Sequence, residues 1–172
     1  KSFNPEFLGV NNINEVKCLR GLGYKNRIIV CGPVTEQELV EAASLGAEVI
    51  LSCFVLLEKW LSLDSRPFVH IKIDTGLARQ GFSLKDIHQV AEKLAEFRNE
   101  RFGVMTHFAC VEDVSDQSYA YFQLGKFKES LWYLKKAGFT KLLVHCSSSA
   151  GALLLSDLHF DLTRIGISLY GF

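Results

Sequence analysis

The chain has 172 residues, of which 48% are hydrophobic, and its 19 Lys and Arg balance 19 Asp and Glu. This composition predicts one globular domain and excludes a disordered or fibrous chain, while the zero net charge argues against nucleic acid or an anionic membrane as a partner. No apolar run approaches the roughly 20 residues of a membrane-spanning helix, and residues 1–6 lack the pattern of a signal peptide.

Short apolar runs rich in β-forming residues recur along the chain and predict seven strands. In order, they cover residues 7–10, 27–32, 48–53, 68–74, 102–109, 141–147 and 165–171. Helical spacing of apolar residues lies between them, most clearly over 35–45, 84–97 and 119–137. Thr35 precedes Glu38 by three residues, which predicts a capping box at the first of these helices.

Strands that alternate with helices in this way predict βαβ units and a parallel sheet within one domain over residues 1–172. Seven strands are one short of a closed (β/α)₈ barrel. The competing fold, an open doubly wound sheet, should carry a Gly-x-Gly-x-x-Gly turn, which this sequence lacks. We therefore expect an α/β fold of the TIM type, a (β/α)₈ barrel with one strand missing.

The strand over residues 68–74 places His70, Lys72 and Asp74 on one face. In a parallel strand covered by helices, that face points into the barrel, so we expect Lys72 to be buried. A buried ammonium must pair with an anion such as Asp74, or lower its pKa and become neutral. A neutral amine could act as a nucleophile or capture carbon dioxide as a carbamate. Both alternatives stay open.

Arg79 follows this strand, at the end where barrel active sites lie. Its guanidinium suits a carboxylate, a phosphate or a phenolate, although a surface arginine is the alternative. His107 closes the strand over 102–109, and it fits a core histidine as well as a functional one.

Two later segments combine into one prediction. His145 ends the sixth strand, and the serines at 147–149 offer hydroxyl groups to an anion. In the last strand, Arg164 needs a buried partner and Gly166 lets a ligand approach the backbone. Because phosphate sites in barrels use the loops after the last two strands, these segments predict a phosphate-bearing ligand.

The cysteines are five in number, widely spaced and without a Cys-x-x-Cys pair, which argues against a disulfide framework and a zinc cluster. Each lies in an apolar run, where a reduced thiol behaves as a small hydrophobic residue. We therefore expect a cytoplasmic protein without a metal site. They are Cys18, Cys31, Cys53, Cys110 and Cys146.

Four segments together resemble alanine racemase in order, spacing and residue type. They are 72–82 (Lys-Ile-Asp-Thr-Gly-Leu-Ala-Arg-Gln-Gly-Phe), 106–109, 145–150 and 164–171. The resemblance spans essentially the whole chain. It implies a barrel-type enzyme with pyridoxal 5'-phosphate as cofactor, a homodimer that interconverts L-alanine and D-alanine by removing a proton on one face and returning it on the other.

The resemblance also implies roles for the cofactor-binding residues. His107 would lie against the pyridine ring, and Arg164 would donate a hydrogen bond to the pyridine nitrogen with His145 in support. Ser149 and the backbone of Gly166 and Ile167 would hold the phosphate.

The catalytic residues implied by the resemblance are His107 and two residues of the strand over 68–74 and the loop after it, Lys72 and Arg79. Arg79 would contact the phenolic oxygen of the cofactor and lie near the substrate carboxylate. Lys72 matches a lysine that is often carbamylated in this family, where the new anion braces the arginine.

The sequence also departs from the family. The lysine that forms the Schiff base lies on the first barrel strand, and no segment matches it. The second base, a tyrosine of the C-terminal β-domain of the partner subunit, is expected beyond Phe172. Leu77-Ala78 stands where Met-Gly is usual, and Ser148 where Asn is usual. We therefore expect a piece of a longer racemase, with strands 2–8 of the barrel, that is inactive alone.

Three alternatives remain at this point. A non-catalytic carrier of pyridoxal phosphate would still need the missing lysine. A racemase of broader specificity would act on serine or lysine as well. A structural domain with a decayed site would scatter its polar residues rather than place them at four successive strand ends.

Overall fold

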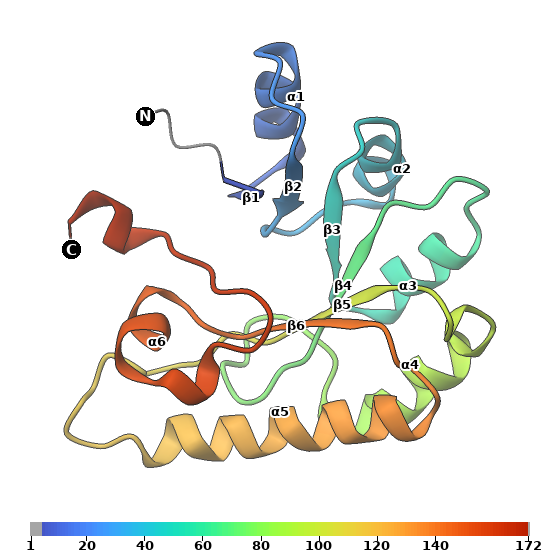
Figure 1. The fold of residues 1–172 in the computed structure, drawn as a ribbon. Helices are drawn as coiled ribbons and strands as arrows, with labels where there is room; N and C mark the ends of the chain where they lie inside the picture. The colour runs from blue at the N-terminus through green and yellow to red at the C-terminus, as the bar shows by residue number, and fades with distance from the viewer. Residues whose placement is uncertain (1–4, 172) are drawn as a thin grey trace. The chain divides into compact units, whose positions relative to one another are not determined.

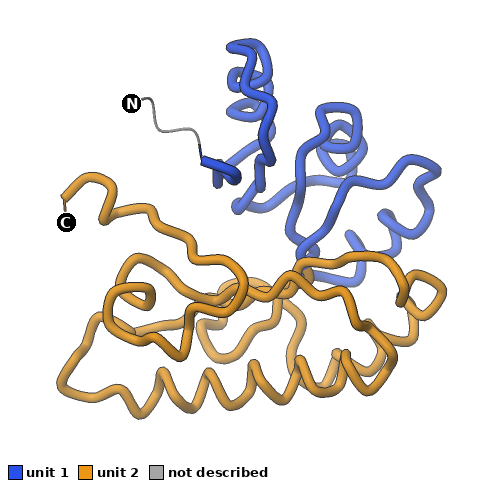
Figure 2. The backbone as a smooth tube through the Cα atoms, in the orientation of Figure 1, with its two compact units in different colours: residues 1–70 blue, residues 71–172 orange. Residues whose placement is uncertain are grey.

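The computed structural model describes residues 5–171, so the prediction about a signal peptide falls largely outside the described residues. The chain forms two compact units, residues 1–70 and 71–172 (Figure 2). Within the described part, none of the helices is long and apolar enough to cross a membrane. The prediction of one domain over residues 1–172 stays a prediction.

Unit 1 alternates strands and helices. It contains β1 (Phe7–Val10), α1 (Ile13–Gly21), β2 (Arg27–Val30), α2 (Glu36–Ser44), β3 (Glu48–Leu51), α3 (Phe54–Leu61) and the first residues of β4 (Val69–Lys72). The strands pair in parallel, with Val30 of β2 opposite Val10 on one side and Val49 on the other.

Unit 2 continues the alternation, and the long helix α5 runs along one side of it (Figure 1). After β4 come η1 (Leu84–Asp86), α4 (Ile87–Lys93), η2 (Ala95–Phe97), β5 (Phe102–Met105), α5 (Ser118–Lys136), β6 (Leu142–His145), α6 (Ser149–Leu154), η3 (Ser156–Leu158) and η4 (Ile167–Tyr170). Its core joins the strands to α5 through fully buried side chains such as Phe102, Phe127, Leu134 and Phe139.

The hydrogen-bonded order of the strands is their order in the sequence, from β1 to β6. A doubly wound sheet reverses its strand order at a switch point, whereas a barrel adds each strand beside the previous one. The observed order and the parallel pairs confirm the prediction of a partial (β/α)₈ barrel over the doubly wound alternative.

The helix predictions differ in accuracy. The Thr35 hydroxyl accepts a hydrogen bond from the Glu38 N–H, and the Glu38 carboxylate accepts one from the Thr35 N–H, so the capping box is confirmed. The helix predicted over 119–137 is α5. The one predicted over 84–97 is shorter, because 3₁₀ turns replace its ends and leave α4 only from Ile87 to Lys93.

The seventh predicted strand, over residues 165–171, is wrong. Residues Ile167–Tyr170 form a 3₁₀ helix, closed by hydrogen bonds from Leu169 N–H to the Gly166 carbonyl and from Gly171 N–H to the Ser168 carbonyl. The N–H groups of Gly166 and Ser168 point to the hydroxyl of Ser149. Local hydrogen bonds and the Ser149 hydroxyl thus bind backbone groups of a segment for which the apolar pattern predicted a strand.

Most of the cysteines lie outside the core. All five are free thiols, but only Cys146 is buried, Cys31 is half-buried, and Cys18, Cys53 and Cys110 are exposed. An apolar run in the sequence does not bury each of its members, because helices and loops turn some side chains to the surface. Burial raises the pKa of Cys146 to about 12, which makes it an unreactive core residue.

Candidate functional site

Arg164 connects the carboxyl ends of β5 and β6. Its Nη1 lies 2.7 Å from Nδ1 of His145. Its Nη2 donates to the carbonyls of Thr106 (2.9 Å) and Cys146 (3.2 Å) and lies 3.4 Å from Nδ1 of His107. A guanidinium has donors only and keeps its proton, so each Nδ1 must act as an acceptor. The arrangement therefore selects the neutral form of both histidines.

His107 is half-buried beside several cations. Burial lowers its pKa, and the charges of Arg164, Lys72 and Arg79 lower it further, to about 4, although Glu112 opposes them. The imidazole is consequently neutral at physiological pH. The same result places Lys72 and Arg79 within electrostatic reach of His107.

The Ser149 hydroxyl is the centre of a small cluster of donors. It is buried, with 5% of the residue exposed, and it accepts hydrogen bonds from the N–H groups of Gly166 (3.0 Å) and Ser168 (3.4 Å). Sequence reasoning placed Ser149, Gly166 and Ile167 at the phosphate. The structure brings the first two together, and the second N–H at the hydroxyl belongs to Ser168, which no sequence pattern marked.

Lys72 is buried on β4, as predicted, with 3% of the residue exposed. The loop after it is closed tightly, because the Phe82 N–H donates to the Lys72 carbonyl and the Asp74 N–H to the Phe82 carbonyl, both at 2.8 Å. Gly81 is required here: φ is +129°, and a Cβ atom would lie 2.8 Å from the Asp74 nitrogen.

Arg79 lies at the exposed tip of this loop. Asp74 fixes the backbone that leads to Arg79, because its Oδ1 accepts hydrogen bonds from the N–H groups of Gly76 (2.9 Å) and Ala78 (3.1 Å). Ala78 has a φ of +55°, a left-handed conformation that favours glycine. Among residues 5–171, Arg79 has no hydrogen-bond or ion-pair partner, so its guanidinium is available to a ligand.

Sequence reasoning missed a buried polar group under these loops. Thr75 and Thr106 share a hydrogen bond between their hydroxyls (2.9 Å), and Gln123 of α5 donates to the Thr75 hydroxyl (3.2 Å). All three are buried. The available signal was a glutamine on the buried stripe of a helix, one turn from Ala120 and Phe127.

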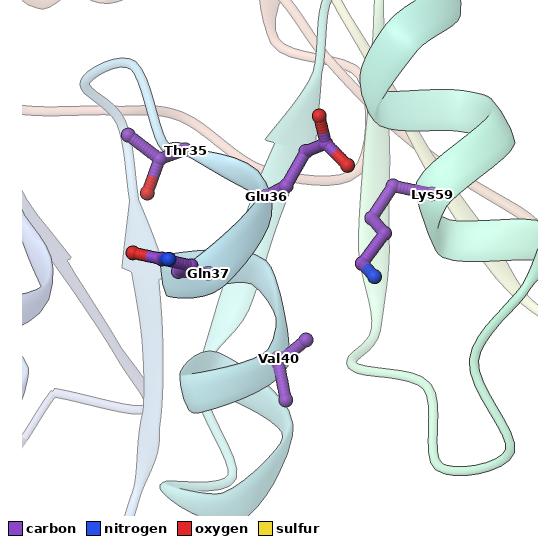
Figure 3. A pocket seen from close by; sticks show the side chains of 5 residues that line it. All are labelled: Thr35, Glu36, Gln37, Val40 and Lys59. Atoms are coloured by element: carbon purple, nitrogen blue, oxygen red, sulfur yellow. The ribbon is translucent and has the colours of Figure 1, made fainter.

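A pocket of about 450 Å³ lies in unit 1, outside this set of residues (Figure 3). It is lined by Thr35, Glu36, Gln37, Val40 and Lys59. The Thr35 hydroxyl already caps α2, and none of the five is a predicted site residue.

The family model for "Alanine racemase, N-terminal domain" matches residues 4–172. The alanine racemase of Leptospira interrogans is 32% identical over 166 residues, which are 95% of this chain and 43% of that protein. The alanine racemase of Methanococcus maripaludis is 33% identical over 95% of this chain and 45% of its own length. The chain thus spans about half the length of these curated relatives.

Solved structures of alanine racemases are similar over the same span. That of Bacillus anthracis, with bound L-Ala-P, has a TM-score of 0.86 at 30% identity and covers 96% of this chain and 44% of its own. That of Corynebacterium glutamicum has a TM-score of 0.86 at 26% identity, over 95% of this chain and 48% of its own.

Proposed function

The chain belongs to the alanine racemase family through the N-terminal domain, and on this premise we propose that the protein carrying it interconverts L-alanine and D-alanine with pyridoxal 5'-phosphate. The observation that carries the proposal is the contact of Arg164 with two histidines next to the Ser149 donor cluster. The family match over residues 4–172 and the names of the relatives support the reaction.

The residues present fit a phosphorylated pyridine. The N–H groups of Gly166 and Ser168 donate to the Ser149 hydroxyl and orient it, and the proton of that hydroxyl remains to be donated to a phosphate. Adding a Cβ atom at Gly166 would meet nothing within 4 Å, so a ligand has room to approach that backbone. We also assign the neighbouring N–H of Ile167 to the phosphate.

Arg164 and the histidines fit the ring. The Arg164 guanidinium can only donate, so a pyridine nitrogen placed against it must accept and stay unprotonated. His145 holds the guanidinium at 2.7 Å, and neutral His107 offers a flat face without a charge that would repel the cations around it.

Pyridoxal phosphate, when bound, supplies an electron sink that makes the Cα proton of an amino acid acidic. Arg164 would tune this property by keeping the ring nitrogen unprotonated, which would weaken the sink. Prompt return of the proton to Cα is then favoured over transfer of the amino group. The chain's arginine thereby directs the reaction toward racemisation.

Arg79 and Lys72 complete the site on its other side. The exposed guanidinium of Arg79 can hold the substrate carboxylate and the phenolic oxygen of the cofactor. Lys72 is buried. If its ammonium group lost a proton, the amine could react with carbon dioxide, forming an N–C bond, releasing a second proton and leaving a carbamate. That anion would brace Arg79.

We further propose that the protein is a cytoplasmic homodimer in which the partner subunit supplies a tyrosine as the second base. The free thiols of the five cysteines support a reducing compartment.

The function is tested by incubating the purified protein, freed of cofactor, with L-alanine. D-alanine should form only after pyridoxal phosphate is added. Faster racemisation of serine or lysine would favour the racemase of broader specificity. Cofactor binding without racemisation of any amino acid would favour the non-catalytic carrier, and no binding would contradict the proposal.

The phosphate assignment is tested by Ser149→Ala. Loss of a hydrogen bond to a charged group costs about 1.5–3 kcal/mol, so the dissociation constant of pyridoxal phosphate should rise about tenfold or more. The control is Ser148→Ala, because the Ser148 hydroxyl accepts from the Gly151 N–H at 3.4 Å within the cap of α6. Equal effects of the two substitutions on cofactor affinity would contradict the assignment.

A further inference from the structure

Gln123 lies on the buried side of α5, and both ends of its side-chain amide are used. None of the residue is exposed. Its Nε2 donates to the Thr75 hydroxyl at 3.2 Å, and its Oε1 accepts the Ala109 N–H at 2.9 Å. A buried amide left without partners would be destabilising. The two hydrogen bonds therefore fix the orientation of this side chain.

The two partners belong to different loops of the candidate site. Thr75 begins the loop after β4, which carries Arg79 four residues later. Ala109 follows His107 by two residues in the segment after β5. One amide from the helix beneath thus joins the segments that present the exposed guanidinium and the neutral imidazole.

The hydrogen bonds extend from Gln123 to the rest of the site. The Thr75 and Thr106 hydroxyls are 2.9 Å apart, and the Thr106 carbonyl accepts from Arg164 at 2.9 Å. One turn before Gln123, the Tyr119 hydroxyl donates to the Gly76 carbonyl at 2.9 Å. Helix α5 therefore contacts the loop after β4 twice and reaches Arg164 through the threonines.

We propose that Gln123 is a positioning residue, which sets the separation between the loop of Arg79 and the segment of His107. The proposal rests on the proposed function in that these segments line the cofactor site. The hydrogen bonds on which it stands do not depend on that function.

A role in packing alone makes a different prediction. If Gln123 only fills space under the strands, methionine, which has a similar length and no hydrogen-bonding amide, should preserve the loops. If Gln123 positions them, Gln123→Met should release the Thr75 side and the Ala109 N–H together. Water would then reach His107, and Arg79 would move away from it.

The experiment follows His107 by NMR in the cofactor-free protein with ¹³C-labelled histidine. In the parent protein, the His107 resonance should stay that of a neutral ring down to about pH 5.5, because burial and the nearby cations hold its pKa at about 4. In Gln123→Met, its pKa should rise above about 5, toward the ordinary value of 6.5. Hydrogen exchange of the Ala109 N–H should quicken in the same variant.

The matched control is Ser130→Ala. Ser130 is a fully buried polar residue of the same helix, but its hydroxyl donates only to the Lys126 carbonyl of α5. This substitution should leave the pKa of His107 and the exchange of Ala109 unchanged. A Gln123→Met protein with the parent pKa and the parent exchange rate would overturn the proposal.

Thr75→Val and Thr75→Ser provide a second pair should the methionine variant fail to fold. Valine keeps the shape and removes the hydroxyl, so it should raise the pKa of His107, whereas serine should restore the parent value. Identical pKa values in the two variants would also overturn the proposal. Failure of the proposed function would be seen separately, as absent pyridoxal phosphate binding in the parent protein.

Discussion

The Arg164 guanidinium fixes the protonation state of the residues around it. It is within 2.7 Å of His145 and 3.4 Å of His107 through nitrogens that must accept. Because the arginine keeps its positive charge and can only donate hydrogen bonds, the two histidine rings that accept from it are neutral. Lysine at this position would lose the planar fork that reaches two carbonyls and two rings at once.

The lowered pKa of His107 predicts a pH dependence of stability. A histidine with a pKa of about 4 when folded and 6.5 when unfolded binds more protons in the unfolded state between these values, so stability is complete above pH 6.5 and falls as the pH falls toward 4. Between pH 6.5 and 5, we expect a loss of about 1.5 kcal/mol in the free energy of unfolding. Urea titrations should show that His107→Gln removes this slope; an unchanged slope would contradict the burial of a neutral ring.

Ala78 predicts a stabilising substitution. Its φ of +55° is costly for a residue with a Cβ atom, by about 1 kcal/mol. Ala78→Gly should therefore raise the free energy of unfolding by about 0.5–1 kcal/mol. Gly46, with a φ of +58° and open space around it, is the reverse control, and Gly46→Ala should lower stability by about 1 kcal/mol. A thermal denaturation series in which both substitutions shift Tm in the same direction would refute this account.

Sequence patterns could mark candidate site residues at strand ends. Lys72, His107 and His145 could be marked in this way because a polar residue at the end of an apolar strand is conspicuous, and Arg164 because it needs a buried partner. Gln123 could not, because helical periodicity reports which face is buried and says nothing of which polar side chain on that face finds partners in a loop far along the chain.

At the scale of elements, the hydrogen bonds available to the backbone decided which secondary structure an apolar segment formed. Both 119–137 and 165–171 are apolar segments, but only the first became the predicted element. In the second, glycine at 166 and the Ser149 hydroxyl allowed local hydrogen bonds in place of a ladder. A sequence pattern cannot supply that hydroxyl, which comes from another segment.

Unit 1 contains a buried charge cluster that links β2, β3 and β4. Glu48 hydrogen-bonds to Nε2 of His70 at 2.8 Å and pairs with Arg27, whose guanidinium lies over the rings of Phe7 (4.2 Å) and Phe68 (5.0 Å). Burial acts to raise the pKa of Glu48, but the hydrogen bonds from His70 and Arg27 outweigh it and hold the pKa below its ordinary value of 4.5. The carboxylate is thus charged and compensated.

Removing this charge should destabilise the fold strongly. Glu48→Gln leaves the buried His70 and the Arg27 guanidinium without their anion, so the free energy of unfolding should fall by about 3 kcal/mol. Glu41→Gln is the control, because Glu41 pairs with Lys17 at 2.7 Å with both side chains exposed, and it should cost less than about 1 kcal/mol. Equal losses in chemical denaturation would show that the buried cluster has no special role.

At the scale of the whole molecule, the strand order follows the sequence order, and this property could be predicted from the alternation of strands and helices alone. The resemblance to alanine racemase rested on motifs from 72 to 171, and the family match over residues 4–172 confirms it. The number of strands was predicted less accurately, since the described residues form six strands where the pattern predicts seven.

The most direct test concerns the nitrogen that Arg164 is proposed to face. Bound pyridoxal phosphate with a ¹⁵N-labelled ring, in the protein that carries this chain, should give the resonance of an unprotonated, hydrogen-bonded pyridine between about pH 6 and pH 9, because arginine keeps its proton throughout this range. The resonance of a protonated ring nitrogen would contradict the account, since a guanidinium cannot accept that proton.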